Sequence, residues 1–237
     1  IFEGGVFMSA LRVRTVRWGY ASTAGGLVAG ALFLAFSSVS PAPAQYDGVA
    51  APPLFMEPVL RVEEDWALVL NEPDGNGDSP QFHTVMSPYS DAGSFFAQVL
   101  WNYRETPDFT SGGVQLQSYN GENLIRRRSL EYGQLSASAE TITWTQSLTT
   151  DGALLSFEVS EGQSTTWGTF GKDMRIDEDA GLASLNDYSP DVSAKESGVT
   201  YGSNRVNTMS ITQVRYYGAS GLLWVDETPR VVFELSN

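Results

Sequence analysis

Apolar and polar residues alternate along most of the chain after residue 58, and each alternating run ends in a turn. In the run 60–70, LRVEEDWALVL, every second side chain from Val62 to Leu70 falls on one face. That face contains Trp66 and is apolar except for Glu64. The run 94–104 places Trp101 on a similar apolar face. A period of two is typical of β-strands with one buried face, so both runs are predicted to be strands.

Two hairpins are predicted from the turn residues between neighbouring runs. Asn120-Gly121 separates strands expected near 113–119 and 124–130, because both residues tolerate the positive φ of a tight turn. The sequence TTDG at 149–152 marks a second hairpin. Around it, two sets of apolar residues are expected to face each other across the pair: Ile142, Trp144 and Leu148 on one strand, and Leu155, Phe157 and Val159 on the other.

The whole pattern predicts an all-β fold. About nine or ten strands fit into residues 59–237, and helical spacing extends no further than a turn or two within 177–189. Only a pair of sheets or a closed barrel buries one face of so many strands. We therefore expect one domain at 59–237, an antiparallel β-sandwich of the jelly-roll or concanavalin-like kind.

The first 44 residues have the pattern of upstream residues followed by a signal peptide. Arg12, Arg14 and Arg17 precede the apolar run ASTAGGLVAGALFLAF, and Ala42-Pro43-Ala44 fits the small-x-small rule for signal peptidase. Residues 45–58, QYDGVAAPPLFMEP, carry no periodicity and are predicted to be an irregular lead-in. The expected location is extracellular or in the cell envelope, without membrane insertion after cleavage. A retained N-terminal anchor is the alternative.

Charge and cysteine content restrict the function further. Removal of residues 1–44 lowers Lys+Arg from 14 to 11 and Asp+Glu from 28 to 27, which leaves a net charge of about −16. Such a surface repels nucleic acid and anionic lipid, so neither is an expected partner. The chain has no cysteine, which excludes thiol catalysis, thiolate metal sites and disulfides.

Four stretches resemble a group of uncharacterised secreted bacterial proteins of the kind found in planctomycetes: VEEDWALVLNEPD, ITWTQSL, STTWGTFG and DETPRVV. The resemblance covers most of residues 57–233 and implies no activity. The run of hairpins, with YNG between two strands, is also similar to concanavalin-type and laminin-G-type jelly rolls. Many proteins of that second group bind glycans or calcium. The resemblance to them therefore implies glycan or calcium binding as an expectation for this chain.

Calcium is the candidate cofactor. Asp74, Asn76 and Asp78 place three side-chain oxygens at every second position of a glycine-rich loop, and Glu72 or Asp91 is near enough in sequence to complete a site. The loop lacks the later ligands of an EF-hand. The alternative is a polar turn shaped by its Gly, Pro, Asp and Asn residues. A second acidic cluster, Asp177–Asp179, is interpreted in the same two ways, as metal ligands or as a solvated loop.

Aromatic residues supply the candidate ligand-binding side chains. Trp66, Trp101 and Trp144 fall on apolar strand faces and are predicted to lie in the core. Trp167 lies among Thr and Gly, and we consider it the candidate sugar-stacking residue, supported by Tyr119 or Tyr201.

Arg126, Arg127 and Arg128 form the only basic run, with Arg126 and Arg128 expected on one face and Arg127 on the other. Two roles are open for them: binding of an anionic glycan, or placing charge on an edge strand so that it does not pair with another sheet. His83 is the only histidine, and we interpret it as structural because no nucleophile-elbow motif accompanies it.

These observations give a ranked set of functions and assign no catalytic residue. The leading interpretation is an exported, acidic β-sandwich that acts as a structural or adhesive module of the cell envelope or extracellular matrix. The second is a glycan-binding domain, with or without calcium. A glycoside hydrolase is third, since a carboxylate pair needs no histidine.

Overall fold

The computed structural model describes residues 55–71, 80–103, 112–135 and 139–236. All of them belong to the second of the two units into which the chain divides, residues 1–37 and 38–237. The described residues form strands, one α-helix and one short 3-10 helix: β1 Arg61–Leu70, β2 Gln81–Met86, β3 Phe95–Trp101, β4 Val114–Asn120, β5 Asn123–Leu130, β6 Thr141–Thr150, β7 Leu154–Ser164, β8 Gly168–Phe170, β9 Met174–Asp179, α1 Pro190–Glu196, β10 Gly198–Tyr201, η1 Ser203–Arg205, β11 Val206–Gly218, β12 Gly221–Asp226 and β13 Arg230–Glu234.

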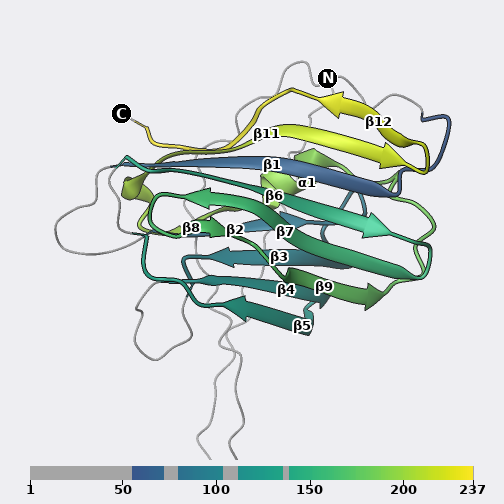
Figure 1. Cartoon of the computed structure of the whole chain (residues 1–237), viewed down its shortest axis with the longest axis horizontal. Coiled ribbons are helices and arrows are strands. Elements are labelled where there is room, and N and C mark those ends of the chain that lie inside the picture. The colour runs from purple at the N-terminus through teal and green to yellow at the C-terminus, as the bar shows by residue number, and fades with distance from the viewer. Residues whose placement is uncertain (1–54, 72–79, 104–111, 136–138, 237) are drawn as a thin grey trace, which may run out of the picture. The chain divides into compact units, whose positions relative to one another are not determined.

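These strands make two antiparallel sheets, as the alternating pattern predicts. The larger sheet has the order β12-β11-β1-β6-β7-β8, with β13 also paired to β11 and β9 to β7. The smaller sheet has the order β10-β2-β3-β4-β5. In Figure 1 the larger sheet lies in front of the smaller one, and their strands run in similar directions. The fold of this unit is therefore all-β and sandwich-like.

Aromatic side chains fill the space between the sheets. Trp66 on β1 stacks on Trp144 on β6, with ring centroids 5.8 Å apart, and the Trp101 ring from the smaller sheet lies 4.3 Å from Trp144. Leu155 and Phe157 on β7 are also fully buried. The prediction that the three tryptophans lie in the core is confirmed, because a period of two fixes which face each side chain occupies.

Both predicted hairpins are present. Asn120 pairs with Asn123, so the loop between β4 and β5 consists of Gly121 and Glu122. Gly121 has φ +58°, while Asn120 stays within β4. Positive φ is therefore needed at the glycine, the first residue of the two-residue loop. The second hairpin joins β6 and β7 around Asp151, whose carboxylate accepts backbone N–H groups from Ala153 and Leu154.

The segment 177–189 differs from the expectation of a loop with a helical turn. Asp177–Asp179 are the last residues of β9, whose side chains alternate between buried and exposed as they pair with β7. The helix α1 begins later, at Pro190, where the fixed φ of proline suits the first helical position. Of the helices in the described ranges, none has the length and apolar content needed to cross a membrane.

Candidate functional site on the outer face of the smaller sheet

The outer face of the smaller sheet carries a row of aromatic and amide side chains. Phe96 on β3 lies opposite Tyr119 on β4, and Gln98 lies opposite Gln117 in the next row of the same face. The intervening residues of β3, such as Ala97, point into the core. The alternation that builds the core therefore also aligns these side chains outside it.

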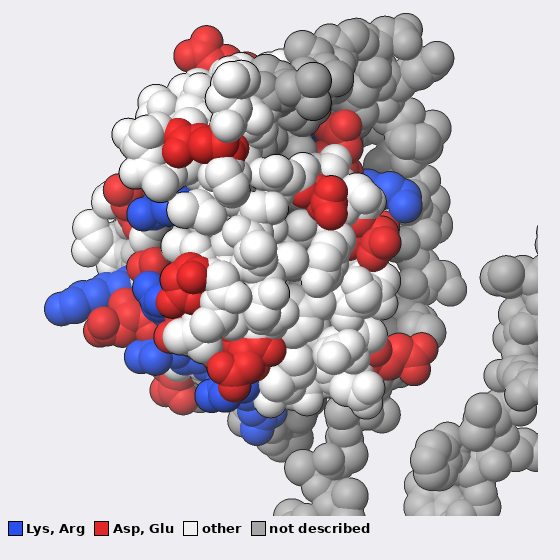
Figure 2. Space-filling view, turned by 90° about the vertical axis from the view of Figure 1, so that its right-hand side faces the viewer, with Lys and Arg blue, Asp and Glu red and all other residues white. Residues whose placement is uncertain are grey.

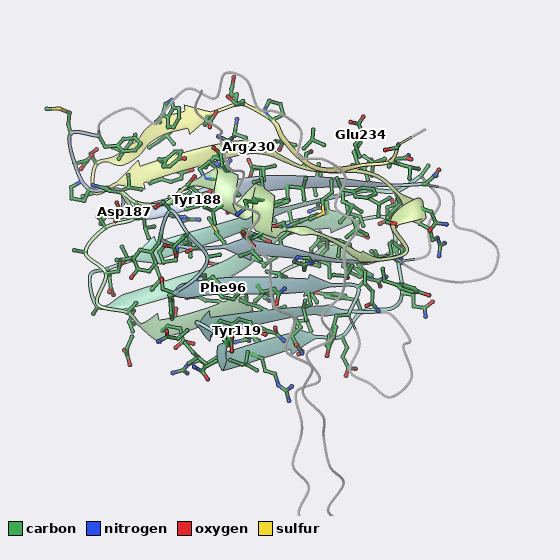
Figure 3. All side chains as sticks on the ribbon, turned by 180° about the vertical axis from the view of Figure 1, so that it is seen from behind. Phe96, Tyr119, Asp187, Tyr188, Arg230 and Glu234 are labelled. Carbon is green, nitrogen blue, oxygen red and sulfur yellow. The ribbon has the colours of Figure 1, made fainter. Side chains whose placement is uncertain are left out.

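Phe96 and Tyr119 form a stacked pair. Their ring centroids are 5.0 Å apart and the ring planes differ by 10°. Figure 3 shows both residues together on the smaller sheet, seen from the side opposite to Figure 1. Both rings are half-buried, and Leu124, opposite Tyr119 on β5, is 44% exposed. The result is an apolar row that crosses three strands.

Hydrogen bonds hold Tyr119 in place. Its hydroxyl donates to Oε1 of Gln117 across 2.5 Å, and Nε2 of Gln117 donates to Oε1 of Gln115. Nε2 of Gln115 then donates to the Ser129 hydroxyl across 2.8 Å. We call these four residues the amide ladder. Because both glutamines are buried, the ladder orients the tyrosine. Burial, and then the nearby Tyr103, raise the pKa of Tyr119 above its ordinary value, so its hydroxyl stays protonated.

The arginine run lies on the edge strand of this sheet. β5 is last in the strand order, and Arg126, Arg127 and Arg128 are all exposed. Arg126 lies opposite Ser118, whose side chain is in the core, whereas Arg127 lies opposite Gln117 on the outer face. The predicted faces are therefore correct, and the edge position agrees with the charged-edge interpretation.

Arg126 also connects the two sheets. Its Nε lies 3.2 Å from Oε1 of Glu178 on β9, and the Ser118 hydroxyl donates to the same carboxylate oxygen across 2.6 Å. Glu178 belongs to the acidic cluster at 177–179, but Asp177 points the other way and bonds to Ser156 and Arg175. Neighbouring members of this cluster face opposite sides of β9, so they do not converge on one ion.

Trp167 lies away from the stacked pair, in an aromatic cluster with Tyr132 and Phe170 at the margin of the core. Its ring stacks on Tyr132 at 5.2 Å and meets Phe170 edge-on at 5.5 Å. Its Nε1 donates to the carbonyl of Gly133 across 2.6 Å. The residue is half-buried, so part of the ring reaches the surface.

The structure does not bring Tyr119 and Tyr201, two of the three sequence-predicted ligand residues, onto one platform. Tyr201 is 48% exposed on β10 and lies opposite Gln81, next to the end of β3 at Trp101. Tyr119 lies opposite Phe96, near the start of β3. At about 3.4 Å per residue, these positions are roughly 17 Å apart along the strand.

The predicted calcium ligands Asp74, Asn76 and Asp78 lie outside the described residues. Asp91, considered as a further ligand, accepts a hydrogen bond from the backbone N–H of Gly93 across 3.0 Å. Within the ranges that the structure describes, no three acidic or histidine side chains gather as a metal site would need.

His83 lies on β2 beneath the end of α1. Its Nε2 donates to the carbonyl of Glu196, the last residue of α1, across 3.0 Å, since a carbonyl can only accept. Nδ1 is buried without a partner. Burial lowers the pKa of His83, which keeps the ring neutral. These contacts give His83 a structural role in holding the helix end.

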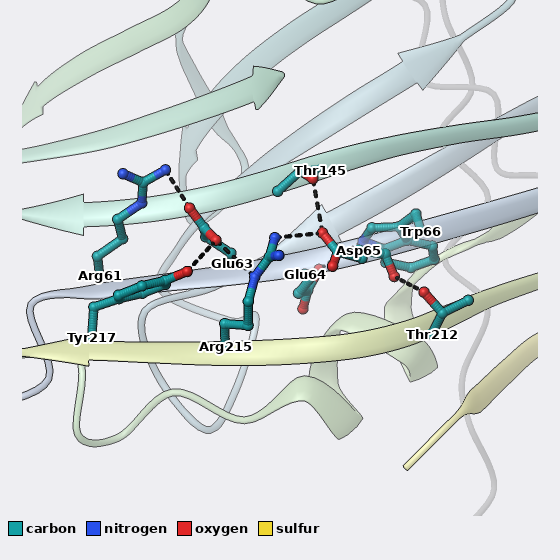
Figure 4. Close-up of polar contacts among 9 residues, drawn as sticks. All are labelled: Arg61, Glu63, Glu64, Asp65, Trp66, Thr145, Thr212, Arg215 and Tyr217. Atoms are coloured by element: carbon teal, nitrogen blue, oxygen red, sulfur yellow. Dashed lines mark hydrogen bonds and ion pairs between the residues drawn. The ribbon is translucent and has the colours of Figure 1, made fainter. Parts of the chain in front are cut away.

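The acidic run 63–65 on β1 divides between the two sides of the larger sheet. Glu63 and Asp65 face outward and share Arg215 on β11, with Nε–Oε2 and Nη2–Oδ1 distances of 2.9 and 2.7 Å (Figure 4). Tyr217 donates to Glu63 and Thr145 donates to Asp65, each across 2.8 Å. This face is a network of paired charges.

Glu64 points into the core instead. It receives hydrogen bonds from Trp66 Nε1 at 2.9 Å and from the Tyr188 hydroxyl at 2.5 Å. Burial raises the pKa of Glu64 to about 7, although these hydrogen bonds oppose the shift. A carboxyl with this pKa resembles a general acid. The residue is 0% exposed, so a polymeric substrate cannot reach it.

Charged groups are dispersed over the side of the molecule that Figure 2 shows. Acidic side chains are spread across this side, and most basic ones lie toward one edge of the view. A scan against protein-family models and a search of curated proteins both return no match. The candidate site is therefore defined by its geometry alone.

Sequence reasoning identified Tyr119 but missed Phe96 and the amide ladder. The period of two in GVQLQSY already places Gln115, Gln117 and Tyr119 on one face. That signal was available from the sequence. The position of Phe96 beside Tyr119 depends on the register between β3 and β4, which a local pattern does not specify.

Proposed function

We propose that the protein is an exported adhesive module that binds a glycan through the outer face of its smaller sheet. Export is inferred from the signal-peptide pattern of residues 1–44. We further propose that the strands follow a concanavalin-like jelly-roll connectivity. The module would attach the cell envelope or matrix to carbohydrate rather than act on it chemically.

The stacked pair Phe96–Tyr119 is the observation that supports this proposal. A pyranose ring has an apolar face bordered by hydroxyl groups, so it is suited to an aromatic surface with polar side chains around it. Gln98 borders the pair on the outer face in the neighbouring row. The amide ladder fixes Tyr119 before a ligand arrives, which reduces the ordering cost of binding.

Glycan binding can be tested with two tyrosine variants of one sheet. The purified protein would be screened on an array of neutral and anionic glycans, and affinities of positive ligands measured by calorimetry. We expect Tyr119→Ala to weaken binding about tenfold or more, equivalent to at least about 1.4 kcal/mol. Tyr201→Ala removes an exposed tyrosine from the distant end of the sheet and is the matched control.

The test compares the glycan affinity of Tyr119→Ala with that of Tyr201→Ala. Circular dichroism would first establish that both remain folded. Equal affinities for the wild type and Tyr119→Ala, or an equal loss in both variants, would rule out this face as the binding surface. Binding only of anionic glycans would extend the site toward Arg127, which lies in the same row as Gln117.

A further inference from the structure

A threonine and a glutamine from opposite sheets contact each other inside the core. Thr84 lies on β2 of the smaller sheet and Gln146 on β6 of the larger one. The Thr84 hydroxyl donates to Oε1 of Gln146. Thr84 is 0% exposed and Gln146 is 3% exposed, so this contact is shielded from water.

Two tryptophans fix the orientation of both groups. Trp144 Nε1 donates to Oε1 of Gln146 across 3.3 Å, and Trp101 Nε1 donates to Oγ1 of Thr84 across 2.9 Å. An indole N–H can only donate, so the amide atom that faces Trp144 is the oxygen. Nε2 of Gln146 is therefore the amide atom that does not contact the Thr84 hydroxyl.

This arrangement has the components of an acyl transfer. The Thr84 oxygen touches an atom one bond from the electrophilic Cδ of Gln146, and such proximity replaces a bimolecular encounter. The Trp144 N–H is directed at the oxygen on which negative charge develops when a nucleophile adds to Cδ.

A buried carboxyl group lies opposite Gln146 on the neighbouring strand, and its oxygens accept hydrogen bonds from Trp66 and Tyr188. Glu64 pairs with Gln146 in the register between β1 and β6, and both side chains are buried in the core. Side chains directly opposite in an antiparallel pair have Cβ atoms about 4.5–5.5 Å apart. Burial raises the pKa of the Glu64 carboxyl to about 7. Below that pH the carboxyl is protonated and can give a proton to a departing amine.

We propose that Thr84 and Gln146 form an intramolecular ester that covalently links the two sheets. The Thr84 Oγ1–Cδ bond forms and the Cδ–Nε2 bond of Gln146 breaks. The leaving nitrogen takes a proton from Glu64 and departs as ammonia, and the hydroxyl proton of Thr84 restores the Glu64 carboxyl. No oxidant, reductant or further reactant is consumed.

The bond would supply a cross-link that this chain otherwise lacks. The protein has no cysteine, so disulfides cannot join its strands. The ester would connect residues 62 positions apart in the chain, and closing a loop of that size restricts the unfolded chain as a disulfide does. The dry core would also protect the ester from hydrolysis.

Mass spectrometry of the folded wild-type protein tests the proposal. We expect an intact mass lower than the sequence mass by one ammonia, and a protease digest in which the peptides containing Thr84 and Gln146 remain joined. Mild alkali applied to the denatured protein should separate them and leave a glutamate at position 146. Two separate, unmodified peptides after prolonged incubation of the folded protein would overturn the proposal.

Variants distinguish this ester from other losses of ammonia. A new N-terminal glutamine can cyclise, and Asn120 can form a succinimide before Gly121, each with the same change in mass. Thr84→Val should abolish the joined peptides, whereas Thr84→Ser keeps the hydroxyl and should retain them. Joined peptides in Thr84→Val would overturn the assignment. Glu64→Gln should slow the reaction, and an unchanged rate would exclude Glu64 as the proton donor.

Discussion

Tyr188 donates its hydroxyl hydrogen to Oε1 of Glu64 across 2.5 Å and thereby ties the segment before α1 to the centre of the larger sheet. The two residues are 124 positions apart in the chain, and both are buried. Burial, with the neighbouring Glu64 charge, raises the pKa of Tyr188 well above its ordinary value, so the phenol remains a donor. One carboxyl group thus organises a long-range contact inside an apolar core.

The buried carboxyl predicts a pH-dependent stability. Glu64 has a pKa of about 7 in the folded protein and about 4.5 when unfolded. Its contribution to the free energy of unfolding is therefore fully present below pH 4.5 and is lost as the pH rises to about 7. A shift of this size corresponds to about 3 kcal/mol. Urea unfolding across this pH range, compared with Glu64→Gln, measures it. Parallel pH curves for the two proteins would contradict the prediction.

Trp144 is predicted to be a position of the core where truncation is strongly destabilising. Trp144→Ala removes a fully buried ring that stacks on Trp66 and contacts Trp101, and should lower the free energy of unfolding by about 3–5 kcal/mol. Trp167→Ala is the control, because its ring is half-buried, and it should cost less. Chemical denaturation gives both values. A larger loss in Trp167→Ala would place the main aromatic core elsewhere.

The turn between β4 and β5 is predicted to require glycine. Gly121→Ala should lower the free energy of unfolding by about 1 kcal/mol, because an L-residue resists the φ of +58° found there. Gly133 is the matched control, since neither position has an atom within 4 Å of an added Cβ and only Gly121 has a positive φ. Thermal unfolding of the two alanine variants checks this. Equal destabilisation would mean that φ does not decide the turn.

Calcium binding at Asp74, Asn76 and Asp78 stays a prediction. If these residues hold the ion, millimolar calcium should raise the melting temperature of the wild type by mass action and leave the double variant Asp74→Ala/Asp78→Ala unchanged. Screening of the acidic surface would act in both proteins and equally with magnesium. Equal shifts with the two cations would therefore leave the segment as a polar turn.

The feature that the local sequence predicts best is which face of its strand each side chain occupies. Trp66 and Glu64 were placed on one inward face, and both are fully buried. Asn120-Gly121 predicts a turn because both residues tolerate a positive φ, and Gly121 adopts φ +58°. The sequence leaves the acidic run 177–179 as either metal ligands or a solvated loop, but pairing with β7 makes it the end of a strand. Tertiary pairing overrode the local preference there.

The sequence by itself determined the all-β class and the faces of the strands, because side chains in a strand must alternate with a fixed period of two. Only the tertiary structure decided which strands are neighbours. β1 pairs with both β6 and β11, and residues far apart in sequence therefore meet, as Glu64 meets Tyr188 and Thr84 meets Gln146. These contacts depend on register and sheet packing, which are settled by the combined burial of many side chains rather than by any single segment.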